Sequence, residues 1–298
     1  MKKPDFFIVG APKCGTTAMN EYLRQHPDIF MPSEKEFGFL ATDFSYRVSR
    51  ITYEEYLAFF PIAKDEKRVG ESSVYNLYSK VASINIKELC PAANIIIMLR
   101  NPVDVIESIH SQLVYNGDEN IKDLSTALEL EEKRKKGLEI PDKVTFDEML
   151  YYRDIVKYTE QIKRYIDVFD RNKIHIIIFD DFREDLASVY KNTLDFLDVE
   201  KNFQPNFQVI NANKGVRSET LKKFLKAPPE AARIVGKVLI PEPVRHALYK
   251  RLRHINTKYQ PRPPMDIKLR KRLQAELTPE VERLSELLNQ DLTHWVTS

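Results

Sequence analysis

Residues 6–17 read Phe-Phe-Ile-Val-Gly-Ala-Pro-Lys-Cys-Gly-Thr-Thr, and this stretch decides the fold. Its apolar start, residues 6–9, predicts a buried strand that ends at Gly10, and a helical pattern begins near Thr16. A strand, a tight loop and a helix N-terminus in this order point free backbone N–H groups at one place, where the helix dipole also favours negative charge. The stretch therefore predicts a phosphate site on an α/β sheet.

The loop departs from a Walker A loop, G-x-x-x-x-G-K-[ST], in the position of its lysine. Gly10 and Gly15 have the Walker spacing and Thr16 follows, but the lysine stands inside the loop as Lys13. A lysine at this position is expected to meet a phosphate that lies directly over the helix N-terminus. This favours a nucleotide with one 5′-phosphate whose substituent is transferred.

Residues 12–17 resemble the 5′-phosphosulfate loop of sulfotransferases that use 3′-phosphoadenosine 5′-phosphosulfate (PAPS). Three further stretches are similar to the same family, namely residues 26–39, 99–108 and 158–181. Together they cover most of residues 5–218 and are most similar to the bacterial and heparan-type branch. The resemblance implies an enzyme that moves a sulfuryl group from PAPS to a hydroxyl or amine and releases adenosine 3′,5′-bisphosphate (PAP).

Strand and helix patterns alternate through the chain, which predicts an α/β three-layer sandwich with a central parallel sheet. The apolar run at residues 95–99 is typical of a central strand. We expect one long amphipathic helix over residues 146–169. With 298 residues the chain is long enough for one sizeable core, so we expect a single domain, 1–298, with its core at 5–218.

After Gly215 the strand signal fades, and we expect a basic helical C-terminal portion over residues 219–298. Thr278 and Pro279 are expected to open the last helix as its N-cap and first residue. Trp295 is expected to dock the tail onto the core. Asp180 and Asp181 follow a predicted strand, but the resemblance makes them structural rather than metal ligands.

The resemblance also implies roles for the residues of the loop and of the next apolar strand. Lys13 is expected to stabilise the charge that develops on the leaving 5′-phosphate, which is held by the loop residues Cys14, Gly15, Thr16 and Thr17. Arg100 and Ser108 are expected to hold the 3′-phosphate, since an arginine fork suits that contact. They converge only if the helix after Pro102 folds back along the strand end.

Glu36 is the candidate general base that the resemblance of residues 35–39 to the family implies, and the aromatic residues after it would exclude water and raise its pKa. A solvated glutamate in a charged loop is the alternative. Glu71 and His110 are rival candidates, although His110 is expected to face away from Ser108 and pack. Lys214 and Arg217 stand where the family closes a basic loop over the 3′-phosphate, and a solvated basic turn is the alternative for them.

Two departures from the heparan-type pattern leave the acceptor open. Ser72 stands where those members have a lysine, and Gln112 stands where they have a histidine. Carbohydrate, lipid-linked sugar, peptide natural product and small alcohol acceptors all remain candidates. We expect the acceptor pocket to include loops at residues 42–50 and 116–143.

Charge is distributed unevenly along the chain. Residues 213–273 contain 17 Lys and Arg against 4 Asp and Glu, whereas the whole chain has a net charge of +2. Solvated helix faces, an anionic acceptor, a membrane surface or a wall around the nucleotide each fit this excess. Residues 118–143 mix both signs, which predicts a solvated helix or a mobile excursion rather than a nucleic-acid site.

The two cysteines, Cys14 and Cys90, make neither a disulfide framework nor a zinc site. Cys14 either has an acidified thiol beside Lys13 or fills a small-residue position, which we favour. No apolar run is long enough to span a membrane, and the first strand begins near Met1. We therefore expect a cytoplasmic enzyme. We also expect that it needs no metal, because a sulfuryl group carries less charge than a terminal phosphate. A P-loop kinase and an inactive PAPS-binding module are the alternatives, and the sequence does not indicate the oligomeric state.

Overall fold

The computed structural model describes residues 2–47, 49–60, 66–208, 214–226, 242–259 and 264–297. In this part of the chain, five parallel strands form the central sheet in the order β2-β3-β1-β4-β5. The strands are β1 (Phe6–Gly10), β2 (Ile29–Phe30), β3 (Arg68–Ser72), β4 (Asn94–Leu99) and β5 (Ile174–Ile178). The predicted α/β fold with a central parallel sheet is confirmed.

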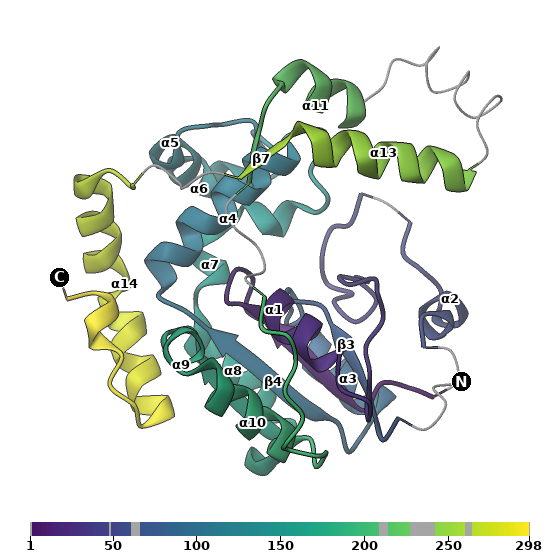
Figure 1. Cartoon of the computed structure of the whole chain (residues 1–298). Helices are drawn as coiled ribbons and strands as arrows, with labels where there is room; N and C mark the ends of the chain where they lie inside the picture. Colours follow the sequence, from purple (N-terminus) through teal and green to yellow (C-terminus); the bar gives the residue numbers. More distant parts are fainter. Residues whose placement is uncertain are drawn as a thin grey trace.

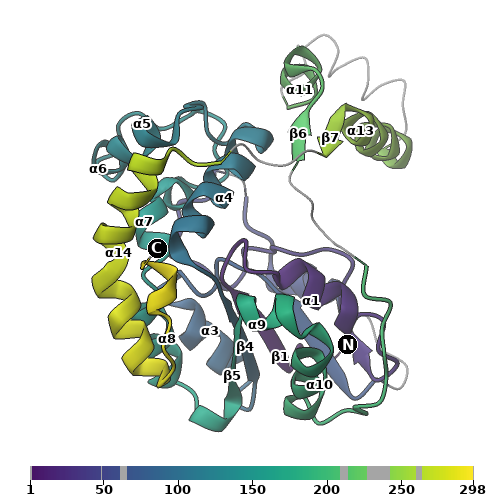
Figure 2. The same cartoon turned by 60° about the vertical axis from the view of Figure 1, so that its left-hand side comes forward.

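Helices cover both faces of this sheet (Figure 1, Figure 2). One face carries α1 (Thr16–Leu23), α9 (Phe179–Glu184) and α10 (Leu186–Phe196), and the other carries α3 (Ala82–Leu89) and α8 (Tyr158–Ile166). The chain leaves β1 toward β2 in one direction and leaves β3 toward β4 in the other. Because both crossovers are right-handed, α1 and α3 must lie on opposite faces.

The strands in the middle of the sheet are apolar throughout because both of their faces are covered. Every residue of β1 and of β4 is buried. The chain turns to opposite sides of the sheet between β1 and β4, and ligands of open α/β sheets bind at the carboxyl ends of strands at such a point. The remaining helices are α2 (Tyr53–Ala58), α4 (Pro102–Asn116), α5 (Leu124–Glu129), α6 (Glu131–Arg134), α7 (Tyr152–Ile155), α11 (Glu219–Lys226), α13 (Glu242–Asn256) and α14 (Ile267–Leu288).

The single long helix expected over residues 146–169 is wrong. A 3₁₀ turn (Asp147–Leu150), α7 and α8 occupy this range, and the helical path breaks at Tyr151 and Lys157, whose ψ angles are 69° and 66°. The buried amide of Gln161 donates to the carbonyls of Asp154 (2.9 Å) and Ile155 (3.0 Å). The break is stable because this side chain replaces the backbone donors that a continuous helix would supply.

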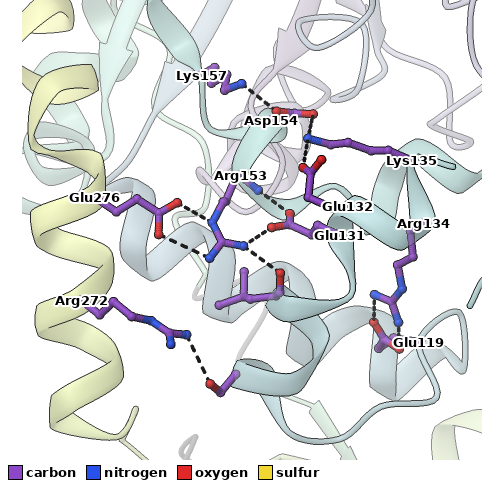
Figure 3. Close-up of polar contacts among 12 residues, drawn as sticks. Glu119, Glu131, Glu132, Arg134, Lys135, Arg153, Asp154, Lys157, Arg272 and Glu276 are labelled. Carbon is purple, nitrogen blue, oxygen red and sulfur yellow. Dashed lines mark hydrogen bonds and ion pairs between the residues drawn. The ribbon is translucent and has the colours of Figure 1, made fainter.

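The solvated helix or mobile excursion expected over residues 118–143 is confirmed only in part. Helices α5 and α6 lie in this range and ten of its fourteen charged residues are exposed, but four are buried, namely Asp118, Glu119, Glu131 and Arg134. Arg134 and Glu119 are buried, and the guanidinium donates to both carboxylate oxygens at 2.7 and 2.9 Å (Figure 3). Tyr152 donates a third hydrogen bond to Glu119, at 2.7 Å. Burial works to raise the pKa of Glu119, but these bonds and the Ile121 amide lower it overall. The charges are tolerated inside the protein because each has a charged or hydrogen-bonding partner.

The C-terminal portion is largely helical, as expected, but its boundaries differ from the prediction. Strands β6 (Lys214–Val216) and β7 (Thr257–Tyr259) form an antiparallel pair where the strand signal had faded. Helix α14 begins at Ile267, capped by Asp266, so Pro279 lies inside it rather than at its start. An internal proline costs about 3 kcal/mol, which the burial of the helix's leucine-rich stripe offsets. That stripe includes Leu273, Leu277, Val281 and Leu284.

The tail docks through Trp295 as predicted. Its indole ring is buried, and its Nε1 donates to Asp180 Oδ2 at 2.7 Å. A hydrogen bond from the Asn101 side chain to the Trp295 carbonyl, at 2.9 Å, adds a second anchor. These contacts confirm the structural role expected for Asp180.

Candidate active site

A cavity of about 650 Å³ opens at the carboxyl ends of the strands. Its walls include residues that directly follow β3 (Ser73), β4 (Arg100) and β5 (Phe179), and the loop after β1. Seven of the residues singled out from the sequence line this cavity, namely Lys13, Gly15, Thr16, Thr17, Glu36, Arg100 and Ser108. The sheet topology thus brings together side chains that are up to 95 positions apart in the sequence.

The loop after β1 has the geometry of an anion cradle. Gly15 is the N-cap of α1 with φ of 87°, which favours glycine, and a Cβ there would meet the ring of Phe179 at 3.1 Å. The first amide groups of a helix have no intrahelical acceptor, so those of α1 can bind an oxyanion at the cavity wall. Three features fit a nucleotide 5′-phosphate. They are the uncapped amide groups of α1, a glycine at the point where the phosphate approaches and a lysine in the loop.

Lys13 is held in position by the helix on the other side of the cavity. Its backbone has φ of 66°, and its Nζ donates to Gln112 Oε1 at 3.3 Å. Gln112 comes from α4 and lines the same cavity. The residue that stands in place of the family's histidine is therefore a direct partner of the loop lysine.

Cys14 fills a small-residue position, as favoured from the sequence. Its side chain is buried, and burial raises the pKa of the thiol to about 12, so the acidified thiol is excluded. Only the backbone of Cys14 is available to contact a phosphate.

The first turns of α4 bring Arg100 and Ser108 to one cavity wall. Asn101 caps the helix by accepting from the Val103 amide at 3.0 Å, and Pro102 occupies its first position. The Arg100 guanidinium lies 4.9 Å from the centre of the Phe179 ring, and its Nη2 donates to Asp104 Oδ2 at 3.4 Å. Asp104 also accepts from Arg270 of α14, at 2.6 Å. The arginine is thus fixed by an aromatic face and a shared carboxylate.

Glu36 projects into the cavity from the loop after β2. The Val74 amide donates to its Oε2 at 2.9 Å, and 43% of its side chain stays exposed toward the cavity. Burial of the surrounding loop raises its pKa, and the nearby Lys35 partly opposes this rise. A carboxylate at the wall of the cavity is placed to accept a proton from a bound acceptor.

Lys35 is a residue that the sequence analysis did not single out. Its Nζ donates to Thr17 Oγ1 at 3.1 Å and lies 3.9 Å from Glu36 Oε1. Burial lowers its pKa, and the charge of Glu36 partly restores it. The side chain therefore joins the phosphate loop to the candidate base. Its place beside Glu36 was visible in the sequence, but its contact with Thr17 depends on the fold.

The two rival bases are not among the residues that line the cavity. Glu71 is 1% exposed and accepts hydrogen bonds from Ser73 and Asn76, and burial raises its pKa to about 8. His110 is buried, its Nε2 lies 2.9 Å from the Ile121 carbonyl oxygen, and burial lowers its pKa. Neither side chain lines the cavity, and His110 packs as expected.

The other end of the cavity is aromatic. Phe146 packs edge-on against Tyr75, with ring centres 5.0 Å apart, and against Tyr46 at 4.9 Å. Asp118 accepts from Thr145 Oγ1 at 3.3 Å. Tyr46, Asn116 and Asp118 come from the two loops expected to form the acceptor pocket, and all three line the cavity. Tyr75 and Phe146 were not foreseen, because their loops are brought together only by the fold.

Lys214 and Arg217 are not among the residues that line this cavity. The backbone of Lys214 is part of β6, and its side chain lies outside the described residues, as does all of Asn213. Arg217 is exposed and its amide donates to the Asn256 carbonyl at 2.8 Å. Their contact with a 3′-phosphate stays a prediction.

The described part of the chain holds no cluster of three or more His, Cys, Asp or Glu that could bind a metal ion. No helix among the same residues has both the length and the apolar character of a membrane span.

Comparison with known proteins places this cavity in a family context. The family model described as "Sulfotransferase domain" matches residues 3–224. Carbohydrate sulfotransferase 15 of Homo sapiens is 23% identical, over 66% of this chain and 44% of the human protein. Membrane-associated sulfotransferase kil1 of Dictyostelium discoideum is 28% identical, over 34% of this chain and 21% of that protein. This chain thus spans less than half the length of these two curated relatives.

A solved structure covers the whole chain. The crystal structure of a sulfotransferase from Alicyclobacillus acidocaldarius superposes with a TM-score of 0.75 at 28% sequence identity, and both chains are covered in full.

Proposed function

We propose that this chain, which belongs to the sulfotransferase domain family, transfers a sulfuryl group from PAPS to a hydroxyl or amine of a carbohydrate or other small acceptor. One observation carries the proposal: an anion cradle, a fixed arginine and a carboxylate with a raised pKa line the same cavity. The cradle and the arginine suit the two phosphates of the donor, and the carboxylate suits the acceptor.

At the donor end, the chain's role is positioning and charge stabilisation. Sulfuryl transfer resembles phosphoryl transfer, in which a loose transition state leaves little covalent work to the protein. The amide groups at the start of α1 would bind the 5′-phosphate, and Lys13 would donate to its bridging oxygen. The hydrogen bond from Lys13 to Gln112 keeps the lysine over the cavity before the donor binds.

Arg100 and Ser108 would bind the 3′-phosphate. The contact with Asp104 occupies one side of the guanidinium, and the planar group has further N–H donors for an oxyanion. Packing against Phe179 restricts its orientation. Ser108 would add a hydroxyl donor from the same helix wall.

At the acceptor end, Glu36 would act as the general base. The acceptor's O–H or N–H bond breaks and its proton moves to Glu36, while the freed electron pair forms a bond to sulfur. The bond from sulfur to the bridging oxygen breaks, and that oxygen keeps its electron pair, stabilised by Lys13. The Val74 amide holds Oε2 of Glu36, so Oε1, which lies 3.9 Å from Lys35 Nζ, is the oxygen that would face the acceptor.

The donor site is tested by calorimetric titration with PAP in the absence of metal, with ATP and magnesium as the comparison. We expect PAP to bind and ATP to give no signal, because the lysine sits where a single 5′-phosphate lies. Arg100→Ala should weaken PAP binding by about tenfold or more, since it removes a charged hydrogen-bond donor. Magnesium-dependent ATP binding would instead indicate a P-loop kinase, and unchanged PAP affinity in the variant would remove the 3′-phosphate assignment.

The transfer step is tested by incubating the protein and PAPS with a cell extract and with panels of sugars, alcohols, phenols and amines. A mass gain of about 80 Da on an extract component would identify the acceptor. Glu36→Gln should keep PAP affinity and lower transfer by about 100-fold or more. Full transfer by this variant would place the base elsewhere, and folded protein that binds PAP without transferring would be a binding module.

A further inference from the structure

The C-terminal half contains an arm that stands off the α/β body. The arm consists of β6, α11, α13 and β7, whose described residues are 214–226 and 242–259. Figure 2 shows its two helices projecting away from the sheet, beyond the end of α4. Nothing in the donor site described above uses these helices.

The arm carries most of the large apolar side chains that the described chain exposes. Five of the nine such residues lie on α11 and α13, namely Phe224, Val244, Leu248, Tyr249 and Ile255. Val244, Leu248 and Ile255 are spaced by four and seven positions, so they form one stripe along α13. The side chains of this stripe are 45–56% exposed. Three exposed aliphatic side chains on one face of a helix differ from the single apolar residues that are scattered over an ordinary surface.

The same segment is strongly cationic. Residues 214–259 contain 12 Lys and Arg against 3 Glu, whereas the whole chain has a net charge of +2. Arg251 is exposed and falls on the α13 stripe itself, between Leu248 and Ile255. A basic helix with an aliphatic face is the pattern of a helix that lies in the plane of a membrane interface.

We propose that the arm docks this protein onto an anionic lipid surface, with the α13 stripe in the headgroup region and the basic side chains among lipid phosphates. The aliphatic stripe distinguishes this partner from a nucleic acid or a sulfated glycan. Those polyanions complement the charge but offer no apolar phase for valine, leucine and isoleucine.

A second copy of this chain fits the arm less well. The other exposed large apolar residues of the described chain are scattered over separate segments, namely Tyr53, Ile84, Leu138 and Ile267. They form no apolar counterpart for the stripe. Two arms facing each other would match apolar stripes but would also oppose two cationic surfaces, which is unfavourable.

The arm is braced against the wall of the active-site cavity. Thr257 Oγ1 of the arm and Tyr115 Oη of α4 share a hydrogen bond of 2.6 Å. Asn256 exchanges two hydrogen bonds with the backbone of Ser218, at 2.8 and 2.9 Å, which joins the two strands of the arm. Because α4 lines the cavity, docking of the arm would hold the cavity beside the lipid surface.

The test is flotation of the full chain with vesicles of phosphatidylcholine alone and of phosphatidylcholine with about 30 mol% phosphatidylglycerol. We expect binding to the anionic vesicles at about 0.1 M salt, at least about tenfold stronger than to the neutral ones, and weaker binding at about 0.5 M salt. Val244→Ser, Leu248→Ser and Ile255→Ser combined should lower binding about tenfold or more. Arg251→Glu should lower it about fivefold or more.

The matched control replaces three equally exposed residues off the arm, Ile84→Ser, Leu138→Ser and Ile267→Ser, and should bind as the unmodified chain does. Absence of flotation with anionic vesicles, or equal loss in the control, would overturn the proposal. So would vesicle binding that the α13 triple variant retains in full, which would indicate a polyanion site. A dimer in light scattering that this variant converts to monomers would assign the stripe to a second copy. Because the experiment measures vesicle binding, its result does not depend on whether the protein transfers a sulfuryl group.

Discussion

The phosphate loop and the charged segment that follows α4 behave in opposite ways. The loop at residues 10–17 has the structure that its local pattern predicts, from the end of β1 to the glycine-capped start of α1. The segment at residues 118–136 has a local pattern that predicts solvation, yet Glu119, Glu131 and Arg134 are buried.

The difference lies in where each region finds its partners. The backbone path of the loop follows from one glycine and from the helix that comes directly after it, although Lys13 also reaches Gln112 of α4. The charged segment is organised by Tyr152, Arg153 and α14, which come from other parts of the chain. Figure 3 shows Arg153 between Glu131 and Glu276 of α14. The local sequence therefore predicts the structure of the phosphate loop correctly, but it does not predict which charges of the second segment are buried.

The largest expected effect concerns the buried pair. Arg134→Ala would leave the Glu119 carboxylate buried without its ionic partner, and we expect a loss of about 3–5 kcal/mol in the free energy of unfolding. Urea titration followed by circular dichroism measures it. Arg134→Met combined with Glu119→Leu removes both charges and should lose much less. If Arg134→Ala costs under about 1 kcal/mol, the segment is solvated as its composition suggests.

The Lys13→Ala variant tests the phosphate loop, which is the other region of the comparison. We expect turnover to fall by about 100-fold or more, because one donor to the leaving oxyanion is lost. The midpoint of urea unfolding should stay unchanged, since the loop is held by its backbone. Lys136→Ala, at an exposed lysine of the charged segment, is the control and should change neither quantity. A large loss of stability in Lys13→Ala would show that the lysine holds the loop together.

Glu71 and Glu119 are two buried carboxylates whose pKa values shift in opposite directions. Their contributions to stability should therefore depend on pH in different ways. Burial raises the pKa of Glu71 to about 8, and a group with a raised folded pKa loses stabilisation as the pH rises. Stability from this residue should therefore be fully present below about pH 4.5 and decline up to about pH 8. Glu71→Gln should remove at least about 1 kcal/mol of this decline. An unchanged pH profile of the melting temperature would contradict the assignment.

The smallest effect is expected at the edge of the charged network. Arg153 pairs with the buried Glu131 on one side and with Glu276 of α14 on the other, and the Glu276 side chain is 38% exposed. Glu276→Ala should cost no more than about 1 kcal/mol, because exposed ion pairs contribute little. If Glu276→Ala lowered the free energy of unfolding by nearly as much as Arg134→Ala does, exposure would not explain the difference between the Arg153–Glu276 and Arg134–Glu119 pairs.

Most of the sheet could be predicted because its strands are apolar runs whose period and ends are local properties. The runs in β1 and β4 need no partner to be recognised. The helix break at Tyr151 could not be foreseen, because the sequence pattern of residues 146–169 is compatible with one helix. The side chain of Gln161, which replaces the missing backbone donors, acts only once α7 and α8 are folded against each other.

The candidate site also contains residues that the sequence predicts and residues whose contacts depend on the fold. Lys13, Gly15 and Thr16 were identified because their order in a strand-loop-helix pattern has a chemical meaning. Lys35 stands next to Glu36 in the chain, but its hydrogen bond to Thr17 exists only because the loop after β2 returns to α1.

By itself, the sequence determined which apolar runs form the central strands and where the phosphate loop lies, since apolar runs, glycines and helix starts act over a few residues. The tertiary structure decided which charges are buried and which aromatic residues wall the cavity. The free energy of a buried charge depends on the partner that reaches it, and the partners of Glu119 and the neighbours of Tyr75 come from distant parts of the chain.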